Sequence, residues 1–483
     1  MSTENKSINA TAWAFIDKIV YTGIQFVISI VLARLLSPND YGVVALLLVF
    51  VSLGQVFIDS GFGNGLIRKE SCTREDYNTA FVFNIIVSIL VYLMLFVAAP
   101  FISNFYKVEI LSSVLRIYGL SLIINSFSIV PNSILTRGLS FKKMAKCRLL
   151  CGVISGVVAI VMAYLGYGVW ALVGQTLLTS LVYSLAVNIE TKWSPRVVFN
   201  YRSFNYLWGF GSKMLLSGLL SSIYSNIYSL VIGRFYSKAD LGYFNRGNSL
   251  GNILPEIIQS SFGKSIFPLL SQQKSDKSAL FALYRKYTKV VSLISFPCII
   301  FSAVFARPFI LLLLTQKWNG AIFYMQVFSL ACLMAPVGMI NMNLLMALGR
   351  SDIMLRADIV KKTIGIIVVL ILVRFSVRTL AVGSLVLEFL IYFVNLYYVK
   401  KTTNIPYFGQ IADMFPFIMV ALFSGLIAFF PQLFVENYLL QIVLGGVLGT
   451  SCYYIILKFI VRSESVLQLE SVVIGAIRHS LHV

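Results

Sequence analysis

The sequence predicts an all-α integral membrane protein of about fourteen transmembrane helices, in two pseudo-symmetric six-helix lobes plus two extra C-terminal helices. Three observations support this fold class. Of the 483 residues, 58% are hydrophobic and only 12% are charged, which excludes a soluble globular protein. Apolar runs of about 20 residues, the length that crosses a bilayer, recur along the whole chain. A duplicated segment divides the chain into two related halves.

The apolar runs are separated by short connections that leave no room for an extramembrane domain. The first run extends from about Ala12 to Leu36. It is too long for the apolar core of a signal peptide and contains Asp17 and Lys18, so we interpret it as a spanning helix. In chain order, the predicted spans begin near Ala12, Gly42, Thr79, Leu111, Leu149, Val169, Leu207, Gly242, Val290, Ala321, Asp358, Thr379, Ile411 and Tyr438.

Residues 29–63 and 229–263 align without a gap at a shift of 200 positions. Ser37-x-x-Asp40-x-Gly42 then matches Ser237-x-x-Asp240-x-Gly242. About six spans fall in each half, and an even number makes the repeat parallel, as in many transporters whose halves rock against each other. The predicted domains are an N-terminal lobe at 1–200 (spans 1–6), a C-terminal lobe at 201–400 (spans 7–12), and spans 13–14 with a cytoplasmic tail at 401–483.

The net charge of +20 indicates membrane orientation rather than nucleic-acid binding. With the N-terminus inside, roughly 27 of the 39 basic residues fall in cytoplasmic loops. The predicted location is therefore the inner (plasma) membrane, multi-pass, with both termini cytoplasmic. Six scattered cysteines suggest no disulfide framework, and the two histidines lie in the C-terminal tail. A histidine metal site, a catalytic triad and a P-loop are not expected, so we predict no cofactor and no enzyme activity.

Polar side chains at helical spacing mark four spans that correspond under the repeat. A single Ser or Asn in a span most often joins helix to helix. Stripes on four related helices instead predict a hydrated central cavity. The stripes are Lys18, Thr22, Gln25 and Ser29; Ser52, Gln55 and Asp59; Lys213, Ser217, Ser221, Tyr224 and Tyr228; and Asn245, Asn248, Asn252, Glu256 and Gln259.

Two lysines, Lys18 and Lys213, lie one to two turns inside the first helix of each half. Either they extend to the cytoplasmic headgroups, or they face each other across an inward-open cleft that Arg116 and Arg246 extend. A cationic lumen of this kind suits an anionic cargo such as a pyrophosphate or an acidic sugar.

Carboxylates also lie within the spans. Asp59 and Glu256 are candidates for carrying a coupling ion, and Glu388 is a weaker one. The alternative is that these carboxylates pair with nearby cations.

Two stretches carry a family resemblance: VLARLLSPNDYGVVALLLVFVSLGQVFIDSGFGNGLIRK (31–69) and NRGNSLGNILPEIIQSSFGKSIFPLLSQQ (245–273). They resemble bacterial polysaccharide (O-antigen and exopolysaccharide) lipid-carrier flippases of the Wzx type. These belong to the superfamily that includes multidrug extruders and lipid II flippases.

The resemblance implies a V-shaped bundle with a cationic central cavity. Its cargo would be an undecaprenyl-pyrophosphate-linked oligosaccharide, moved to the outer leaflet by alternating access for O-antigen, capsule or exopolysaccharide assembly. Polymerase and chain-length proteins of the same pathway would be partners. The residues implicated are the basic Lys18, Lys213, Arg246 and Arg116, and the polar Gln25, Gln55, Tyr224, Asn248 and Asn252, which suit sugar hydroxyls.

Two alternatives stay open, a second kind of transporter and a membrane enzyme. A cation-coupled multidrug extruder of the same superfamily predicts a pocket dominated by carboxylates, whereas the stripes here are at least as basic as acidic. A membrane enzyme of glycan assembly, either a polymerase or a glycosyltransferase, usually presents its catalytic residues on a long external loop. The external loops of this chain are short.

Overall fold

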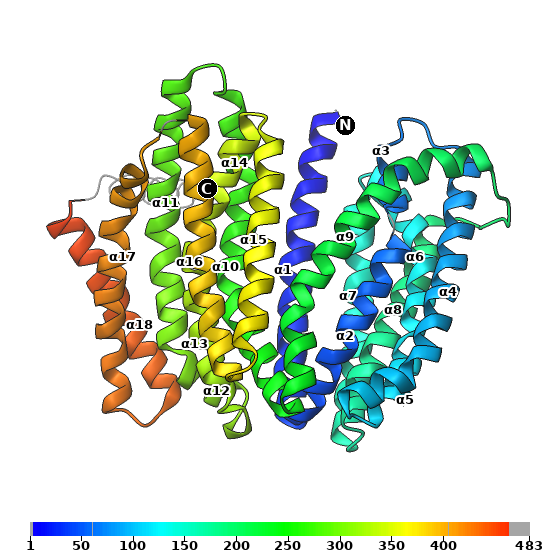
Figure 1. Cartoon of the computed structure of the whole chain (residues 1–483), viewed down its shortest axis with the longest axis horizontal. Coiled ribbons are helices and arrows are strands. Elements are labelled where there is room, and N and C mark those ends of the chain that lie inside the picture. The colour runs from blue at the N-terminus through cyan, green and yellow to red at the C-terminus, as the bar shows by residue number, and fades with distance from the viewer. Residues whose placement is uncertain (1–2, 60, 404, 463–483) are drawn as a thin grey trace, which may run out of the picture. The chain divides into compact units, whose positions relative to one another are not determined.

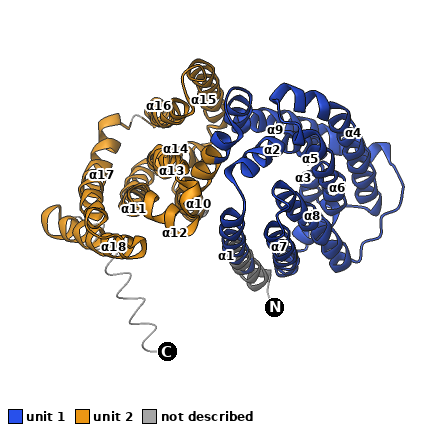
Figure 2. Ribbon diagram, turned by 90° about the horizontal axis from the view of Figure 1, so that it is seen from below, with its two compact units in different colours: residues 1–242 blue, residues 243–483 orange. Residues whose placement is uncertain are grey.

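The computed structural model describes the backbone of residues 3–59, 61–403 and 405–462, and their side chains apart from those of 3–12, 14–19 and 264. Every regular element in this part of the chain is a helix, which confirms the predicted fold class. The helices form two compact units, residues 1–242 and 243–483 (Figure 2).

Unit 1 is a bundle of long helices joined by short turns (Figure 1). Within it, α1 packs along α7, α7 along α8, and α2 along α9. The predicted division of the repeat at residue 200 therefore differs from the boundary of the compact unit, since α9 packs in unit 1. The helices are α1 (Thr3–Leu35), α2 (Pro38–Asp59), α3 (Phe62–Arg68), α4 (Arg74–Tyr106), α5 (Ile110–Tyr118), α6 (Leu120–Arg137), α7 (Phe141–Tyr164), α8 (Val169–Thr191) and α9 (Tyr201–Phe235).

Small residues allow α1 and α7 to approach closely. Gly152 and Gly156 lie one turn apart on α7 and face α1, where a Cβ on Gly156 would overlap the side chain of Ile28. A Cβ on Gly152 would lie 3.1 Å from Nε2 of Gln25. Lipid tails are as apolar as the side chains, so the hydrophobic effect does not drive helices together in a bilayer. Helices associate there through close packing of this kind.

Unit 2 begins within α10, whose first residues belong to unit 1. Its helices are α10 (Lys238–Gln272), α11 (Lys277–Val304), α12 (Ala306–Leu313), η1 (Gln316–Trp318), α13 (Ala321–Ala331), η2 (Cys332–Met334), α14 (Ala335–Ala347), α15 (Ser351–Leu372), α16 (Val377–Thr403), α17 (Tyr407–Phe429), η3 (Phe430–Leu433), α18 (Tyr438–Ile455) and η4 (Ile456–Ile460).

The two extra C-terminal helices, α17 and α18, pack against each other and α17 packs along α11. Glycine again sets the spacing, because a Cβ on Gly449 would lie 2.8 Å from the Cβ of Ala428. The apolar core of unit 2 continues from α11 into α14 and α16, with Phe296 and Ile340 fully buried. The extra helices are therefore an integral part of this unit.

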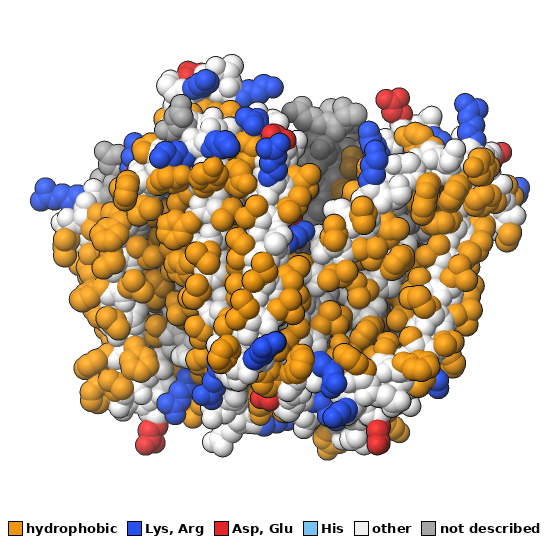
Figure 3. Space-filling model, viewed as in Figure 1, with side chains coloured by type: hydrophobic (Ala, Val, Ile, Leu, Met, Phe, Trp, Pro, Cys, Tyr) orange, Lys and Arg blue, Asp and Glu red, His pale blue; other side chains and the backbone are white. Residues whose placement is uncertain are grey.

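Among the described residues, eleven helical segments are long and apolar enough to cross a membrane, and Val20–Leu35 is a shorter apolar helix. The helices α10 and α15 are 35 and 22 residues long but are outside that set. The count of fourteen spans stays a prediction. On the face drawn in Figure 3, hydrophobic side chains cover the middle of each unit, and Lys and Arg gather toward the helix ends. This distribution is the one expected of membrane-embedded bundles.

Candidate functional site

In unit 1 the polar stripe of α2 meets α9. Ser52 Oγ lies 3.4 Å from Ser222 Oγ and accepts a hydrogen bond of 3.1 Å from Nδ2 of Asn226. Ser222 and Asn226 are on a different face of α9 from the predicted stripe. Sequence inspection missed them, although their i, i+4 spacing on a polar helix is a detectable signal.

The same face of α2 continues into a short chain of polar contacts. Gln55 donates from Nε2 to Asp59 Oδ1 over 3.0 Å, and Asn125 of α6 donates from Nδ2 to Gln55 Oε1 over 3.5 Å. Gln55 and Asp59, both predicted site residues, are thus brought together, and the Asp59 side chain is exposed. A carboxylate with one amide partner retains acceptor capacity for a further ligand.

The three predicted cationic residues whose side chains the structure describes take different environments. Lys213 on α9 is exposed and has no ion pair among the described side chains. Arg116 on α5 donates from Nε to the Phe96 carbonyl over 3.3 Å, and its guanidinium lies 4.4 Å from the Phe96 ring centroid. Arg246 on α10 is only 7% exposed and lies 6.0 Å from the ring centroid of the buried Trp318. The side chain of Lys18 lies outside the described residues.

The three described cations therefore differ in what they can contact. Lys213 retains a charge that is accessible to a ligand, whereas the guanidinium of Arg116 contacts α4 and that of Arg246 is buried inside unit 2. A cation against an aromatic face is stabilised where it sits. The role of all four as a cationic lumen stays a prediction, and Lys213 is the described residue whose surroundings fit it best.

Gln25 and Tyr224 complete the predicted lining residues of unit 1. Gln25 is half-buried at the contact between α1 and α7. Tyr224 is half-buried on α9. Both side chains keep part of their surface accessible, and their part in a cavity lining stays a prediction.

In unit 2, the α10 stripe contacts the break between α13 and α14. Asn252 donates from Nδ2 to Asn248 Oδ1 over 2.6 Å, and its own Oδ1 lies 2.8 Å from the Sγ of Cys332, the first residue of η2. Glu256, one turn further along α10, is exposed. The two predicted asparagines therefore contact each other, as their i, i+4 spacing indicates.

A pocket of about 230 Å³ lies next to this stripe, between α10, α14 and α16. Its polar lining comes from Gln259, Glu388, Tyr392 and Asn395, and three of the other six lining residues are methionine. Asn395 is 5% exposed, and its Oδ1 has no hydrogen-bond partner among the described atoms. Tyr392 and Asn395 were missed from the sequence, although with Glu388 they follow i, i+4, i+7 spacing on one face of α16.

One wall of this pocket is held by a buried network. Tyr392 donates to Gln410 Oε1 over 2.9 Å, and Gln410 donates from Nε2 to Asn341 Oδ1 over 2.7 Å. Asn341 Oδ1 also accepts from the hydroxyl of Tyr284 over 2.7 Å. Four helices (α11, α14, α16 and α17) are thereby joined, so the position of Tyr392 depends on the extra helix α17. Buried polar groups joined in this way rigidify their surroundings.

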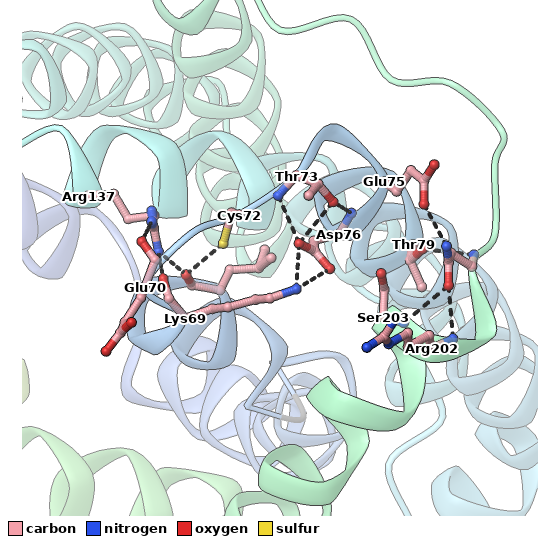
Figure 4. A network of polar contacts seen from close by, with 12 residues as sticks. Lys69, Glu70, Cys72, Thr73, Glu75, Asp76, Thr79, Arg137, Arg202 and Ser203 are labelled. Carbon is pink, nitrogen blue, oxygen red and sulfur yellow. Dashed lines mark hydrogen bonds and ion pairs between the residues drawn. The ribbon is translucent and has the colours of Figure 1, made fainter.

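A second network, at one end of unit 1, uses basic residues that we attributed to membrane orientation (Figure 4). Arg137 of α6 donates to the Leu66 carbonyl over 2.6 Å, to the Lys69 carbonyl, and to the Glu70 carbonyl over 3.1 Å. It thus satisfies the carbonyls that the short helix α3 leaves unpaired at its C-terminus.

The loop that follows α3 is held just as firmly (Figure 4). Lys69 Nζ lies 2.7 Å from the buried carboxylate of Asp76, which also belongs to the capping box of Thr73 at the start of α4. The Cys72 thiol donates to the Leu66 carbonyl over 3.2 Å, and burial is the main cause that raises its pKa. These contacts fix the loop between α3 and α4, so their role is structural.

The amino-acid sequence matches the family described as "Polysaccharide biosynthesis protein" over residues 31–323, more than half of the chain. The chain belongs to this family. The resemblance noted at residues 31–69 and 245–273 is therefore confirmed.

Relatives of this polysaccharide biosynthesis protein extend over most of its length. It is 26% identical over 473 residues to the teichuronic acid biosynthesis protein TuaB of Bacillus subtilis (strain 168), covering 94% of this chain and 96% of the relative. It is 25% identical over 309 residues to the succinoglycan biosynthesis transport protein ExoT of Rhizobium meliloti (strain 1021), covering 64% and 63%. It is 22% identical over 367 residues to the lipopolysaccharide biosynthesis protein WzxC of Escherichia coli (strain K12), covering 75% and 74%.

Solved structures share the fold of this polysaccharide biosynthesis protein. The lipid II flippase MurJ in an inward closed conformation superposes with a TM-score of 0.76 at 14% identity, covering 94% of this chain and 99% of MurJ. An inward-facing multidrug resistance transporter of the MATE family superposes with a TM-score of 0.61 at 18% identity, covering 81% and 98%. The fold is therefore that of a multi-span membrane transporter.

Proposed function

We propose that this polysaccharide biosynthesis protein is a flippase that moves an undecaprenyl-pyrophosphate-linked oligosaccharide from the inner to the outer leaflet of the cell membrane. The observation that carries the proposal is membership of a polysaccharide biosynthesis family in a chain whose fold matches a lipid II flippase over 94% of its length. The relative ExoT, which is named as a transport protein, supports transport rather than an enzymatic step.

Within this proposal, the repeat 1–200 and 201–400 supplies two lobes, and 401–483 adds the extra helices. The N-terminus is inside and both termini are cytoplasmic, because that orientation places most basic loops in the cytoplasm. Lys18 and Lys213 attract the pyrophosphate, with Arg116 and Arg246 as more distant contributors, and the polyprenyl tail stays in lipid. Polymerase and chain-length proteins receive the translocated unit.

Transport against a gradient requires an energy source, and an intramembrane carboxylate is the common carrier of a coupling ion. Asp59 and Glu256 are both exposed and so accessible to one. Glu388 in the α16 pocket is a third candidate, because Gln259 and Asn395 supply further oxygen ligands beside it.

The test is accumulation of lipid-linked oligosaccharide in cells that lack the chain, with complementation by wild type, Lys18→Ala, Lys213→Ala and the control Lys274→Ala. Lys274 is an exposed loop lysine. We expect the wild type and Lys274→Ala to clear the intermediate, and the other two variants to leave it at the cytoplasmic leaflet despite normal protein levels.

The outcome against the proposal is normal surface glycan and no intermediate in the deletion strain. If drug tolerance also changed, a cation-coupled multidrug extruder would replace the flippase as the proposed function. The fold shared with a MATE transporter is compatible with that alternative. A membrane enzyme of glycan assembly would instead leave an unextended precursor in both leaflets.

A further inference from the structure

An apolar groove lies between α15 and α16 in unit 2, with a volume of about 370 Å³. Thr379 is the polar residue among the nine that line it. Gly383 brings the two helices together, because a Cβ on it would overlap the side chain of Leu372. Val382 and Val386 lie beside this contact and are exposed, so the groove is open along its side. We call it the α15–α16 groove.

The α15–α16 groove has the depth of one membrane leaflet. Its lining on α16, one of the eleven apolar segments, runs from Thr379 to Leu390, eleven positions further on. At 1.5 Å per residue this distance is about 16 Å, roughly half of the 30 Å hydrocarbon core of a bilayer. Hydrophobic side chains cover the outward faces of α15 and α16 in Figure 3. A hydrocarbon chain that enters from one membrane surface would therefore fill the groove and end near the midplane.

Two arginines lie at the end of the groove that carries Thr379. Arg374 is in the turn between the two helices, Arg378 is in the first turn of α16, and both side chains are exposed. The Arg378 guanidinium lies 5.5 Å from the ring centroid of Phe323 on α13, a contact that positions it without using its N–H groups. Neither arginine has a carboxylate partner among the described residues. Guanidinium groups bind phosphate through paired hydrogen bonds, so this end of the groove fits a lipid phosphate.

We propose that the α15–α16 groove binds one acyl chain of an anionic membrane phospholipid, whose phosphate is held by Arg374 and Arg378. Two cations favour a headgroup with a net negative charge over a zwitterionic one, because the ammonium group of the latter repels them. The polyprenyl chain of the proposed cargo is much longer than the groove, so it fits less well. None of the nine lining residues is among those proposed to bind the cargo or a coupling ion, so this site is additional to the proposed function.

Lipid binding to the full chain in detergent micelles tests the charged end of the groove. The chain is titrated with phosphatidylglycerol and with phosphatidylcholine of the same acyl chains, and bound lipid is counted by native mass spectrometry. The double variant Arg374→Gln, Arg378→Gln should bind phosphatidylglycerol about 25-fold more weakly, at about fivefold for each arginine. The control Arg307→Gln should bind as the wild type does, because it changes an exposed arginine of α12, which packs against α13 and α18. Equal wild-type affinity for the two lipids, or wild-type affinity in the double variant, would overturn the proposal.

Filling the groove tests the acyl-chain site. Val386→Trp adds a large side chain at an exposed lining position, whereas the control Val447→Trp adds it at an exposed position of α18, outside the groove. Val386→Trp should weaken phosphatidylglycerol binding about tenfold or more, since displacing two methylene groups already has an effect of that size. Val447→Trp should leave it unchanged. Wild-type affinity in Val386→Trp would contradict the acyl-chain site, and the arginine variants decide the proposal if Val386→Trp fails to fold.

Undecaprenyl phosphate is the competing occupant of the groove. We expect its binding to be the same in Val386→Trp as in the wild type. If it bound more tightly than phosphatidylglycerol and Val386→Trp abolished its binding, the groove would hold the polyprenyl chain and the proposal would be wrong. Because these titrations involve no transport, a negative result leaves the proposed flippase intact. Normal surface glycan in the deletion strain would reject the flippase and leave the lipid site intact.

Discussion

Replacing Asp413 with asparagine tests what holds α17 in unit 2. The Asp413 side chain is 6% exposed and accepts hydrogen bonds from Arg285 Nε over 2.7 Å and Nη2 over 2.8 Å. Lys289 Nζ lies 3.5 Å from Oδ1 of the same carboxylate, the oxygen that also accepts from Arg285 Nη2. Asparagine keeps the size of the side chain but removes the charge that both cations bind. The substitution therefore isolates the ion pair from the packing.

The expected loss follows from where the pair lies. A hydrogen bond to a charged group contributes about 1.5–3 kcal/mol when buried, and an exposed ion pair about 0–1 kcal/mol. Here the carboxylate is buried but the Arg285 side chain is 58% exposed, so we expect a loss of about 2 kcal/mol. In a unit of this size, that corresponds to a fall of about 5 °C in the unfolding midpoint.

The measurement is thermal unfolding of the full chain in detergent micelles, followed by the fraction that remains monodisperse. The control is Asp358→Asn, which breaks the 3.0 Å ion pair between Asp358 and Lys362. The side chain of Asp358 is 53% exposed. That pair is an i, i+4 surface pair worth about 0.3–0.5 kcal/mol. Equal midpoints for the two variants would refute the reasoning that burial of the carboxylate makes the α11–α17 pair the stronger one.

Two further predictions concern packing and pH. Gly156→Ala should destabilise the contact of α7 with α1 by about 1–3 kcal/mol, because the new Cβ overlaps Ile28, and a wild-type unfolding midpoint would argue against that overlap. Asp276 caps α11, and hydrogen bonds from Ser278 and from the Ala279 amide lower the pKa of its carboxyl. A lowered pKa in the folded state stabilises the protein above pH of about 4, and this contribution is lost as the pH falls through the folded pKa. Asp276→Asn should remove that part of the decrease in unfolding midpoint at acid pH. An unfolding midpoint that decreases at acid pH as in the wild type would contradict the prediction.

Helical periodicity explains which parts of the site were predictable. Gln55 with Asp59, and Asn248 with Asn252, are i, i+4 pairs, and the structure joins each pair by a hydrogen bond. The contact between Tyr392 and Gln410 was not predictable, because it joins two helices whose relative rotation depends on packing. Spacing within one helix can be read from the chain, whereas register between helices cannot.

The sequence by itself determined the all-helical membrane fold, because hydrocarbon requires every backbone group to bond within its own apolar helix. The duplicated halves and the family could also be recognised from the sequence, because both are patterns of residues along the chain. It also specified the cap of α11, because Asp276 bonds to residues only two and three positions away. Only the tertiary structure decided that Gly156 meets Ile28, that Arg137 binds the end of α3, and that α17 holds the wall of the α16 pocket. Those contacts join residues tens to hundreds of positions apart, and close packing of side chains on facing helices sets their geometry.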